Sequence, residues 1–133
     1  MDTEDLMREF LAAFESRDAS RLVEFLHEDV RFTHYGDPAV HGRDNVVSMW
    51  ASLFPMFETV RFETVNQAVS GSVVLAEQFH YLGLKGREPA PIRNMAVYEI
   101  RDGLIGAWRD YTDSAYSGHL LDASRPIPSY QWT

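Results

Sequence analysis

The segment VYEIRDGLIGAWRDYTD, residues 97–113, decides the fold class of this chain. It contains two β-rich runs on either side of Asp102-Gly103, a pair that favours a type I′ turn because both central positions of that turn need positive φ. The segment therefore predicts a tight antiparallel hairpin. Two further β-rich stretches precede it, and the four successive antiparallel strands are expected at residues 59–69, 73–82, 92–101 and 104–112.

Upstream of residue 57 the apolar residues follow a helical period. A first helix is expected after Thr3, with one apolar stripe that ends near Arg17, and a short second helix is expected after Ser20. A strand at residues 30–35 then precedes a third helix, which opens near Gly42 and ends near Pro55. The stripe of the first helix consists of Leu6, Phe10, Leu11 and Phe14. This order predicts an α+β fold in which a curved antiparallel sheet packs against three helices from the N-terminal half.

The length of 133 residues favours a single domain that buries roughly two-thirds of its unfolded surface. We expect one domain over residues 1–133, with a core at about 3–120 and an irregular tail at 121–133. Tyr130 and Trp132 are aromatic residues in that tail, so we expect them to pack on the body or on a partner subunit.

Composition disfavours several classes of partner. The formal net charge of −8 opposes binding to nucleic acid or to an anionic membrane surface. No cysteine is present, which excludes thiolate chemistry and agrees with a reducing compartment. The N-terminal segment MDTEDLMREF has no signal-peptide pattern, and no run approaches the roughly 18 apolar residues of a membrane span. A cytoplasmic protein is the expectation.

Three polar residues interrupt the predicted apolar strands: His34, His80 and Asp110. Strand alternation places Gln78 beside His80, Phe32 beside His34 and Trp108 beside Asp110, and it also puts Asn94 and Tyr98 on one face of their strand. We expect His34, Gln78, His80, Trp108 and Asp110 to line one cavity. Burial among Phe10, Phe32 and Trp108 would shift the pKa values of the Asp and His towards neutrality, where proton transfer becomes feasible.

Each of these polar residues also has a structural explanation that does not involve catalysis. Asp110 and His80 also fit a buried core pair, His34 fits a solvated strand end, and Gln78 fits a structural hydrogen-bond partner. His27, His41 and His119 fit the surface, and Asp113 fits a turn at a strand end.

A metal site and a catalytic triad are two other chemical interpretations of the polar residues. Two His and one Asp can form a facial metal triad, but here they are scattered over three strands and the chain has no HExxH. It also has no G-x-S-x-G elbow and no Gly-rich phosphate loop. We therefore expect neither a metal nor a cofactor.

Three sequence segments resemble those of the nuclear transport factor 2-like superfamily, and within it those of the SnoaL-like proteins, ketosteroid isomerases and limonene-epoxide hydrolases. They are FLAAFESRDASRLVEFLHEDVRF (10–32), HGRDNV (41–46) and residues 97–113. The resemblance implies a cone-shaped α+β fold and sheet-to-sheet homodimers, for which the face carrying Phe79 and Tyr81 is the expected interface. It also implies that Asp110 occupies the place of the water-activating base of the epoxide hydrolases.

The other catalytic positions of these families depart from the family patterns. Gln78 and His80 replace the Arg and Asp of the epoxide hydrolases, and Phe32 and His34 replace their Tyr and Asn. The base of the ketosteroid isomerases aligns with His34, but their oxyanion-hole residues align with Phe10 and Ala96. The base of the SnoaL-like cyclases falls near Ala96 as well.

These observations predict a cofactor-free enzyme of the isomerase or cyclase type that acts on a small, mostly apolar molecule. Asp110 is the expected base, His80 the proton-donating or orienting partner, and His34 a further polar or basic group. The expected substrate contacts are Gln78, Phe32, Trp108, Phe10, Asn94 and Tyr98. Epoxide hydrolysis is the close alternative, and a non-catalytic role in ligand binding or assembly is the alternative from another class.

Overall fold

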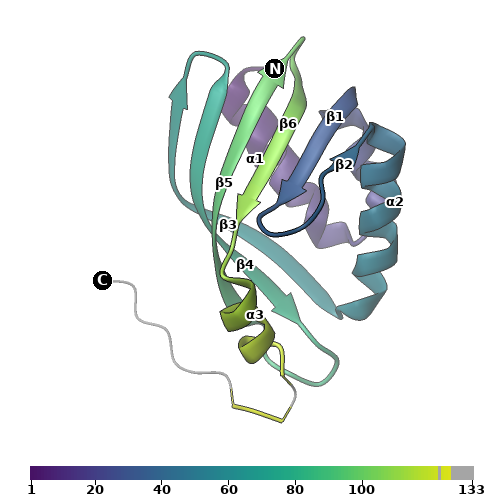
Figure 1. Ribbon diagram of the computed structural model, residues 1–133, viewed down its shortest axis with the longest axis vertical. Helices are drawn as coiled ribbons and strands as arrows, with labels where there is room; N and C mark the ends of the chain where they lie inside the picture. Colours follow the sequence, from purple (N-terminus) through teal and green to yellow (C-terminus); the bar gives the residue numbers. More distant parts are fainter. Residues whose placement is uncertain (123, 127–133) are drawn as a thin grey trace.

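A single curved sheet organises the molecule, as the computed structural model shows for residues 1–122 and 124–126 (Figure 1). Its six strands lie in the order β2-β1-β6-β5-β4-β3. The strands are β1 Leu26–His34, β2 Val40–His41, β3 Thr59–Ser70, β4 Val73–Gly83, β5 Ala90–Arg101 and β6 Leu104–Tyr111. The predicted α+β class and the four long strands are confirmed.

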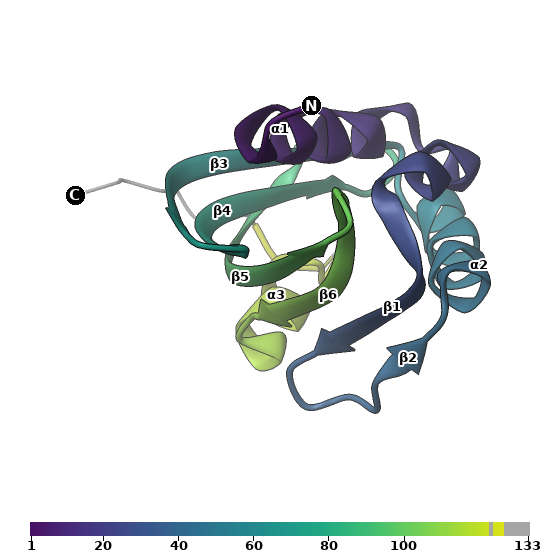
Figure 2. The ribbon, with the colours of Figure 1, turned by 90° about the horizontal axis from the view of Figure 1, so that it is seen from above.

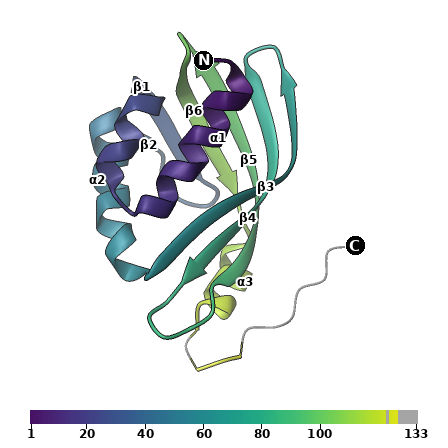
Figure 3. The same cartoon turned by 180° about the vertical axis from the view of Figure 1, so that it is seen from behind.

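The helices lie mainly in the N-terminal half. The α-helices are α1 Thr3–Ala13, α2 Arg43–Leu53 and α3 Ser114–Leu120, and the 3-10 helices are η1 Phe14–Ser16, η2 Ala19–Phe25 and η3 Phe54–Met56. Asp2, rather than the expected Thr3, caps α1 by accepting a hydrogen bond from the backbone N–H of Asp5 at 2.8 Å. Helix α1 crosses the sheet in Figure 3, and α2 runs beside β1 in Figure 1.

The turn between β5 and β6 has the predicted geometry. Asp102 has a φ of 54° and Gly103 a φ of 75°, so both central residues have the positive φ of a type I′ turn. The hairpin fixes the register in which Ala96 faces Asp110 and Tyr98 faces Trp108. The catalytic candidate on β6 is thereby placed relative to β5.

Two features correct the sequence-based prediction. The sheet is mixed, because β1 pairs parallel to β6, with Phe32 opposite Trp108 and His34 opposite Asp110. Parallel pairing is possible here because a long connection separates the two strands in the chain. Helix α3 was not predicted either; Asp113, expected to form a turn, caps it by accepting from the backbone N–H of Tyr116 at 3.0 Å. Tyr130 and Trp132 lie outside the described residues.

Aromatic rings fill much of the concave side of the sheet, which curves strongly in Figure 2. Phe10 of α1 packs edge-to-face on Trp108 at a centroid distance of 5.2 Å, and Trp50 of α2 stacks on Trp108 at 5.9 Å. Phe14 contacts Phe62 of β3 at 4.4 Å. Helices α1 and α2 are thus fixed to the sheet through one aromatic cluster, and a cavity remains beside it.

Candidate functional site

The cavity has a volume of about 360 Å³ and lies between the sheet, α2 and α3. Most of its lining is apolar: Phe32, Pro38, Val40, Met49, Trp50, Leu53, Phe57, Phe62, Leu82, Ile92 and Leu121. Its polar lining consists of His34, Asp37, His80, Asp110, Thr112 and Ser117. An apolar cavity with a few converging polar groups is typical of a small-molecule site.

Asp110 is buried and lines this cavity. Its Oδ1 atom accepts a hydrogen bond from Nδ2 of Asn94 at 3.0 Å and one from Nε1 of Trp108 at 3.1 Å. Burial raises the pKa of Asp110 from 3.8 to about 6, although these two hydrogen bonds and the nearby His34 act in the opposite direction. The carboxyl group therefore titrates close to neutral pH, as a general base needs to.

Three further polar side chains connect to Asp110 across β4 and β5. Asn94 donates from Nδ2 to Oε1 of Gln78 at 3.1 Å, and Gln78 donates from Nε2 to the hydroxyl of Tyr98 at 3.2 Å. Nε2 of His80 lies 2.8 Å from the same Oε1 atom of Gln78. We call Gln78, His80, Asn94 and Asp110 the floor of the cavity. Less than a tenth of the surface of each of these four residues is exposed.

His80 is neutral in this surrounding. Burial, assisted by the charge of the nearby His34, lowers the pKa of His80 to about 3. Its ring stacks on Phe62 at a centroid distance of 3.8 Å, which fixes the plane of the imidazole. Asn94 lies between His80 and Asp110 and contacts both, so the expected pair shares one bridging amide.

His34 reaches the cavity from the end of β1. Because it is the register partner of Asp110, the two side chains are neighbours on one face of the sheet. Its Nδ1 atom lies 3.2 Å from Oδ2 of Asp37, but outside the orientation of a hydrogen bond. The side chain of His34 is 32% exposed and that of Asp37 is 69% exposed, so this end of the cavity meets solvent.

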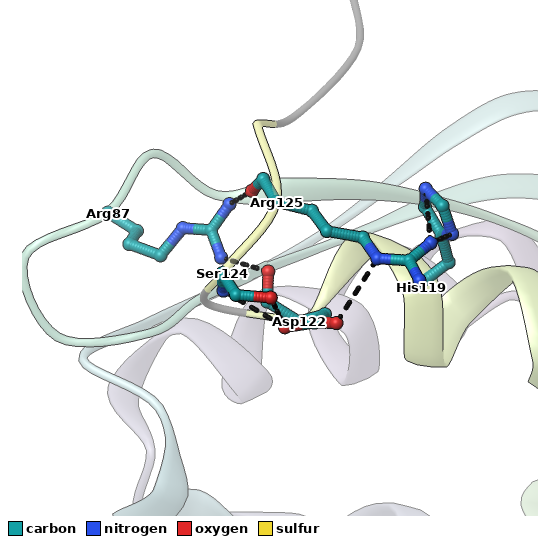
Figure 4. Close-up of polar contacts among 5 residues, drawn as sticks. All are labelled: Arg87, His119, Asp122, Ser124 and Arg125. Atoms are coloured by element: carbon teal, nitrogen blue, oxygen red, sulfur yellow. Dashed lines mark hydrogen bonds and ion pairs between the residues drawn. The ribbon is translucent and has the colours of Figure 1, made fainter.

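Helix α3 covers one side of the cavity with Ser117 and Leu121, the second of which lies just beyond the helix end. Arg87, on the β4–β5 connection, holds the segment after α3 by donating to the carbonyl oxygens of Asp122 and Arg125, each at 2.6 Å (Figure 4). Asp122 also pairs with Arg125 at 3.3 Å. Helix α3 is therefore held both by Arg87 of the β4–β5 connection and by buried Leu120, which packs on Ala90 and Ile92 of β5.

The structure brings together most of the residues that the sequence singled out. His34, His80, Asp110 and Phe32 line the cavity. The remaining expected lining and contact residues are buried in the packed interior and do not line the cavity: Gln78, Trp108, Phe10, Asn94 and Tyr98. Gln78, Asn94 and Trp108 therefore act on the cavity by orienting His80 and Asp110.

Sequence reasoning missed several lining residues. Thr112 lies two positions after Asp110 on the same face, and alternation alone could have identified it. Trp50 lies on α2, where helical spacing alone does not separate a core residue from a cavity residue, and nothing local in the sequence indicates that Asp37 and Ser117 meet at the cavity.

No group of three or more His, Cys, Asp or Glu in residues 1–122 and 124–126 is arranged to hold a metal ion. Within the same part of the chain, none of the helices combines the length and apolarity that a membrane span requires.

Comparison with known proteins agrees with this architecture. A family model described as SnoaL-like domain matches residues 7–108. An LEH-like epoxide hydrolase from M. tuberculosis has 24% identity and a TM-score of 0.72, with 88% of this chain and 86% of that chain covered. A protein with a ketosteroid isomerase-like fold from Catenulispora acidiphila, solved in complex with trimethylamine, has 18% identity and a TM-score of 0.80, with 98% and 100% covered.

A third solved structure is a protein from Shewanella denitrificans assigned to the SnoaL-like polyketide cyclases. It has 12% identity and a TM-score of 0.78, with 90% of this chain and 96% of that chain covered. At these identities the three structures show a common fold, the nuclear transport factor 2-like fold.

Proposed function

Because the chain belongs to the SnoaL-like domain family, we propose that it is a cofactor-free acid/base enzyme of the isomerase or cyclase type. The observation that carries the proposal is the environment of Asp110. Two donors hold its Oδ1 atom, while Oδ2 accepts no hydrogen bond from the described residues and belongs to a side chain that lines an apolar cavity. A fixed carboxylate with one available oxygen and a raised pKa is suited to removing a proton from a bound molecule.

His34 is the group that completes the proton transfer. It was expected to act beside His80, but the low pKa of His80 and the contact of its Nε2 atom with Gln78 make His80 unsuited to donating a proton to a ligand. His34 lies next to Asp110 across the β1–β6 pair and reaches solvent at its other side. Asp110 accepts the proton that the substrate loses, and His34 supplies the proton that the product gains.

Epoxide hydrolysis is the second candidate. It is favoured by the similarity to the epoxide hydrolase from M. tuberculosis and by the position of Asp110, which could remove a proton from a water molecule. In that reaction His34 would protonate the oxirane oxygen. A protein that only binds a small apolar ligand is the non-catalytic alternative.

Single-turnover kinetics test the enzyme proposal. A ligand that co-purifies with the protein is first identified by native mass spectrometry and then offered to wild type, Asp110→Asn, His34→Gln and the double variant. We expect each single variant to lose roughly 10²–10⁴-fold in rate, which is the usual contribution of a positioned acid or base. The double variant should be scarcely slower than the worse single variant, since groups that act as a unit are not additive. An unimpaired Asp110→Asn protein would overturn the mechanism.

We also propose a homodimer formed through the outer face of the sheet. Leu75, Met95 and Tyr111 lie on this face and are 46%, 48% and 46% exposed. Glu99 and Arg109 form an ion pair on the same face, so a two-fold arrangement can oppose unlike charges. Light scattering should report a dimer that Met95→Lys weakens, whereas Val69→Lys on the opposite face should leave it intact.

We place the enzyme in the cytoplasm, since the chain has no cysteine.

A further inference from the structure

The direction of the Asn94 amide determines what the floor offers to a ligand. Its Oδ1 atom accepts the hydroxyl proton of Thr112 at 2.5 Å. Its Nδ2 atom donates to Oδ1 of Asp110 and to Oε1 of Gln78, and these two hydrogen bonds use both of its hydrogens. A carboxylate only accepts hydrogen bonds, so the reversed amide would place two acceptors against each other. The floor therefore has one consistent orientation.

The same reasoning fixes the tautomer of His80. Its Nε2 atom lies 2.8 Å from Oε1 of Gln78, and an amide oxygen can only accept, so Nε2 carries the hydrogen. A neutral imidazole has one N–H, and Nδ1 therefore keeps its lone pair. Gln78 is held in this direction because its Oε1 atom accepts from Nδ2 of Asn94 at 3.1 Å, and a reversed Gln78 amide would place two donors against each other.

Two acceptor atoms remain to face the cavity. In the part of the chain that the structure describes, the sealed polar side-chain atoms without a hydrogen bond belong to His34, Arg43 and Trp50. Oδ2 of Asp110 and Nδ1 of His80 are not among them, and both residues line the cavity. The two groups are neighbours, because one nitrogen of Asn94 contacts Asp110 at 3.0 Å and His80 at 3.3 Å. The second N–H of Gln78 belongs to a side chain that does not line the cavity, so what Asp110 and His80 offer a ligand are two acceptors.

We propose that this cavity prefers a small, largely apolar molecule that presents a hydrogen-bond donor, a hydroxyl or an amine, to Asp110 and His80. A molecule that presents a carbonyl oxygen to these two residues should bind less tightly. A hydroxyl or amino hydrogen satisfies Oδ2 of Asp110 or Nδ1 of His80, whereas a carbonyl oxygen meets two lone pairs with no hydrogen between them. The inference rests on the proposed function and deepens it. The proton that Asp110 removes comes from an O–H or N–H group, whose freed electron pair forms a bond to a carbonyl carbon elsewhere in the same molecule. The π bond of that carbonyl breaks as this bond forms, and its oxygen takes the proton that His34 supplies, which completes a cyclisation.

Thr112 acts as a positioning residue for this selection. Its hydroxyl is the donor that holds Oδ1 of Asn94 away from the cavity floor. Asp110 decides which way the amide points, because a hydroxyl can donate or accept and a carboxylate only accepts. Loss of the Thr112 hydroxyl removes one of the hydrogen bonds that hold the amide in that position. The selectivity between donor and acceptor ligands should therefore depend on Thr112.

The test compares three six-membered rings of nearly equal size: cyclohexanol, cyclohexylamine and cyclohexanone. Their dissociation constants are measured by ligand-observed NMR at pH 8, where the carboxyl group of Asp110 is ionised. We expect cyclohexanol or cyclohexylamine to bind at least roughly 10-fold more tightly than cyclohexanone, since an unsatisfied buried polar group costs about 1–3 kcal/mol. Tight binding of the amine alone identifies an ammonium ligand, and comparable binding of the alcohol identifies a hydroxyl ligand. Equal or tighter binding of the ketone, or no binding of any ring, would overturn the proposal.

Two variants connect the preference to the floor. Thr112→Val should reduce the ratio of donor to ketone affinity several-fold, and Thr112→Ser, which keeps the hydroxyl, should preserve it. An unchanged ratio in a folded Thr112→Val protein contradicts the positioning role. The affinities are measured without turnover, so a loss of selectivity can be distinguished from failure of the catalytic proposal, which the Asp110→Asn and His34→Gln kinetics test separately.

Discussion

The floor of the cavity and its rim hold their side chains by different means. We call His34, Asp37, Ser117 and Leu121 the rim. In the floor, Gln78 is 1% exposed and Asn94 is 3% exposed, and each makes several hydrogen bonds to buried partners. At the rim, the side chain of Asp37 is 69% exposed and that of His34 is 32% exposed, and Nδ1 of His34 forms no hydrogen bond with Asp37. Buried hydrogen bonds are expensive to break and exposed contacts are screened, so the floor sets the chemistry while the rim adapts to the ligand.

Replacing the amide at the centre of the floor should produce the largest effect on stability. Asn94→Leu keeps the volume but removes a donor from Asp110, a donor from Gln78 and the acceptor of Thr112. We expect a loss of about 3 kcal/mol or more in the free energy of unfolding, because one of the groups that lose a hydrogen-bond partner is a buried carboxylate. Urea denaturation at pH 7 measures it.

Asn45→Leu is the matched control. Asn45 is exposed near the start of α2, away from the proposed dimer face, and donates to the carbonyl oxygen of His41 at 2.9 Å. Its replacement should change the free energy of unfolding by no more than about 0.5 kcal/mol. Similar losses in the two variants would remove the distinction between a buried floor and the surface.

The charge of Asp110 should make the floor destabilising at high pH. Below pH 3.8 the carboxyl group is protonated in both the folded and the unfolded chain, and between 3.8 and about 6 the unfolded chain ionises first. The stability that the neutral form provides is therefore lost as pH rises through this window, by up to about 3 kcal/mol at 1.36 kcal/mol per pKa unit.

Asp110→Asn removes that cost. The variant should be more stable than wild type at pH 8, and the difference should shrink as the pH approaches 4. Chemical denaturation at pH 4, 6 and 8 measures the difference, with Asp37→Asn at the rim as the control that stays close to wild type. A variant that is less stable than wild type at pH 8 would show that the buried carboxylate is stabilised more by its two donors than it is penalised by burial.

The contrast between floor and rim also explains what the sequence could predict. Alternation along β1, β4 and β6 correctly placed His34, His80 and Asp110 on one face, because the period of a strand is independent of the rest of the fold. The alternation of side chains along a strand shows on which face of the sheet a residue lies. It does not show whether the residue borders the cavity or lies in the packed interior. Trp108 and Tyr98 were therefore expected at the cavity, yet they lie in the packed interior.

The features that escaped prediction depend on contacts between distant segments. The parallel pairing of β1 with β6 follows from how the chain crosses over, and neither strand encodes it alone. The direction of the Asn94 amide follows from Thr112, Gln78 and Asp110 together, so no local pattern contains it. The hairpin at Asp102 was predictable because its turn chemistry is local.

The smallest effect is expected at the fastening of α3. Arg87 donates from two nitrogens to the carbonyl oxygens of Asp122 and Arg125, which a single ammonium group cannot reproduce with the same geometry. Arg87→Lys and Arg87→Ala should therefore both lower the free energy of unfolding by no more than about 1 kcal/mol, since these contacts are partly exposed. Hydrogen exchange should nevertheless accelerate in residues 114–122. Because Ser117 and Leu121 line the cavity, KM should rise a few-fold while kcat stays unchanged. A change in kcat without faster exchange would mean that α3 takes part in the chemistry and that the rim, like the floor, is fixed.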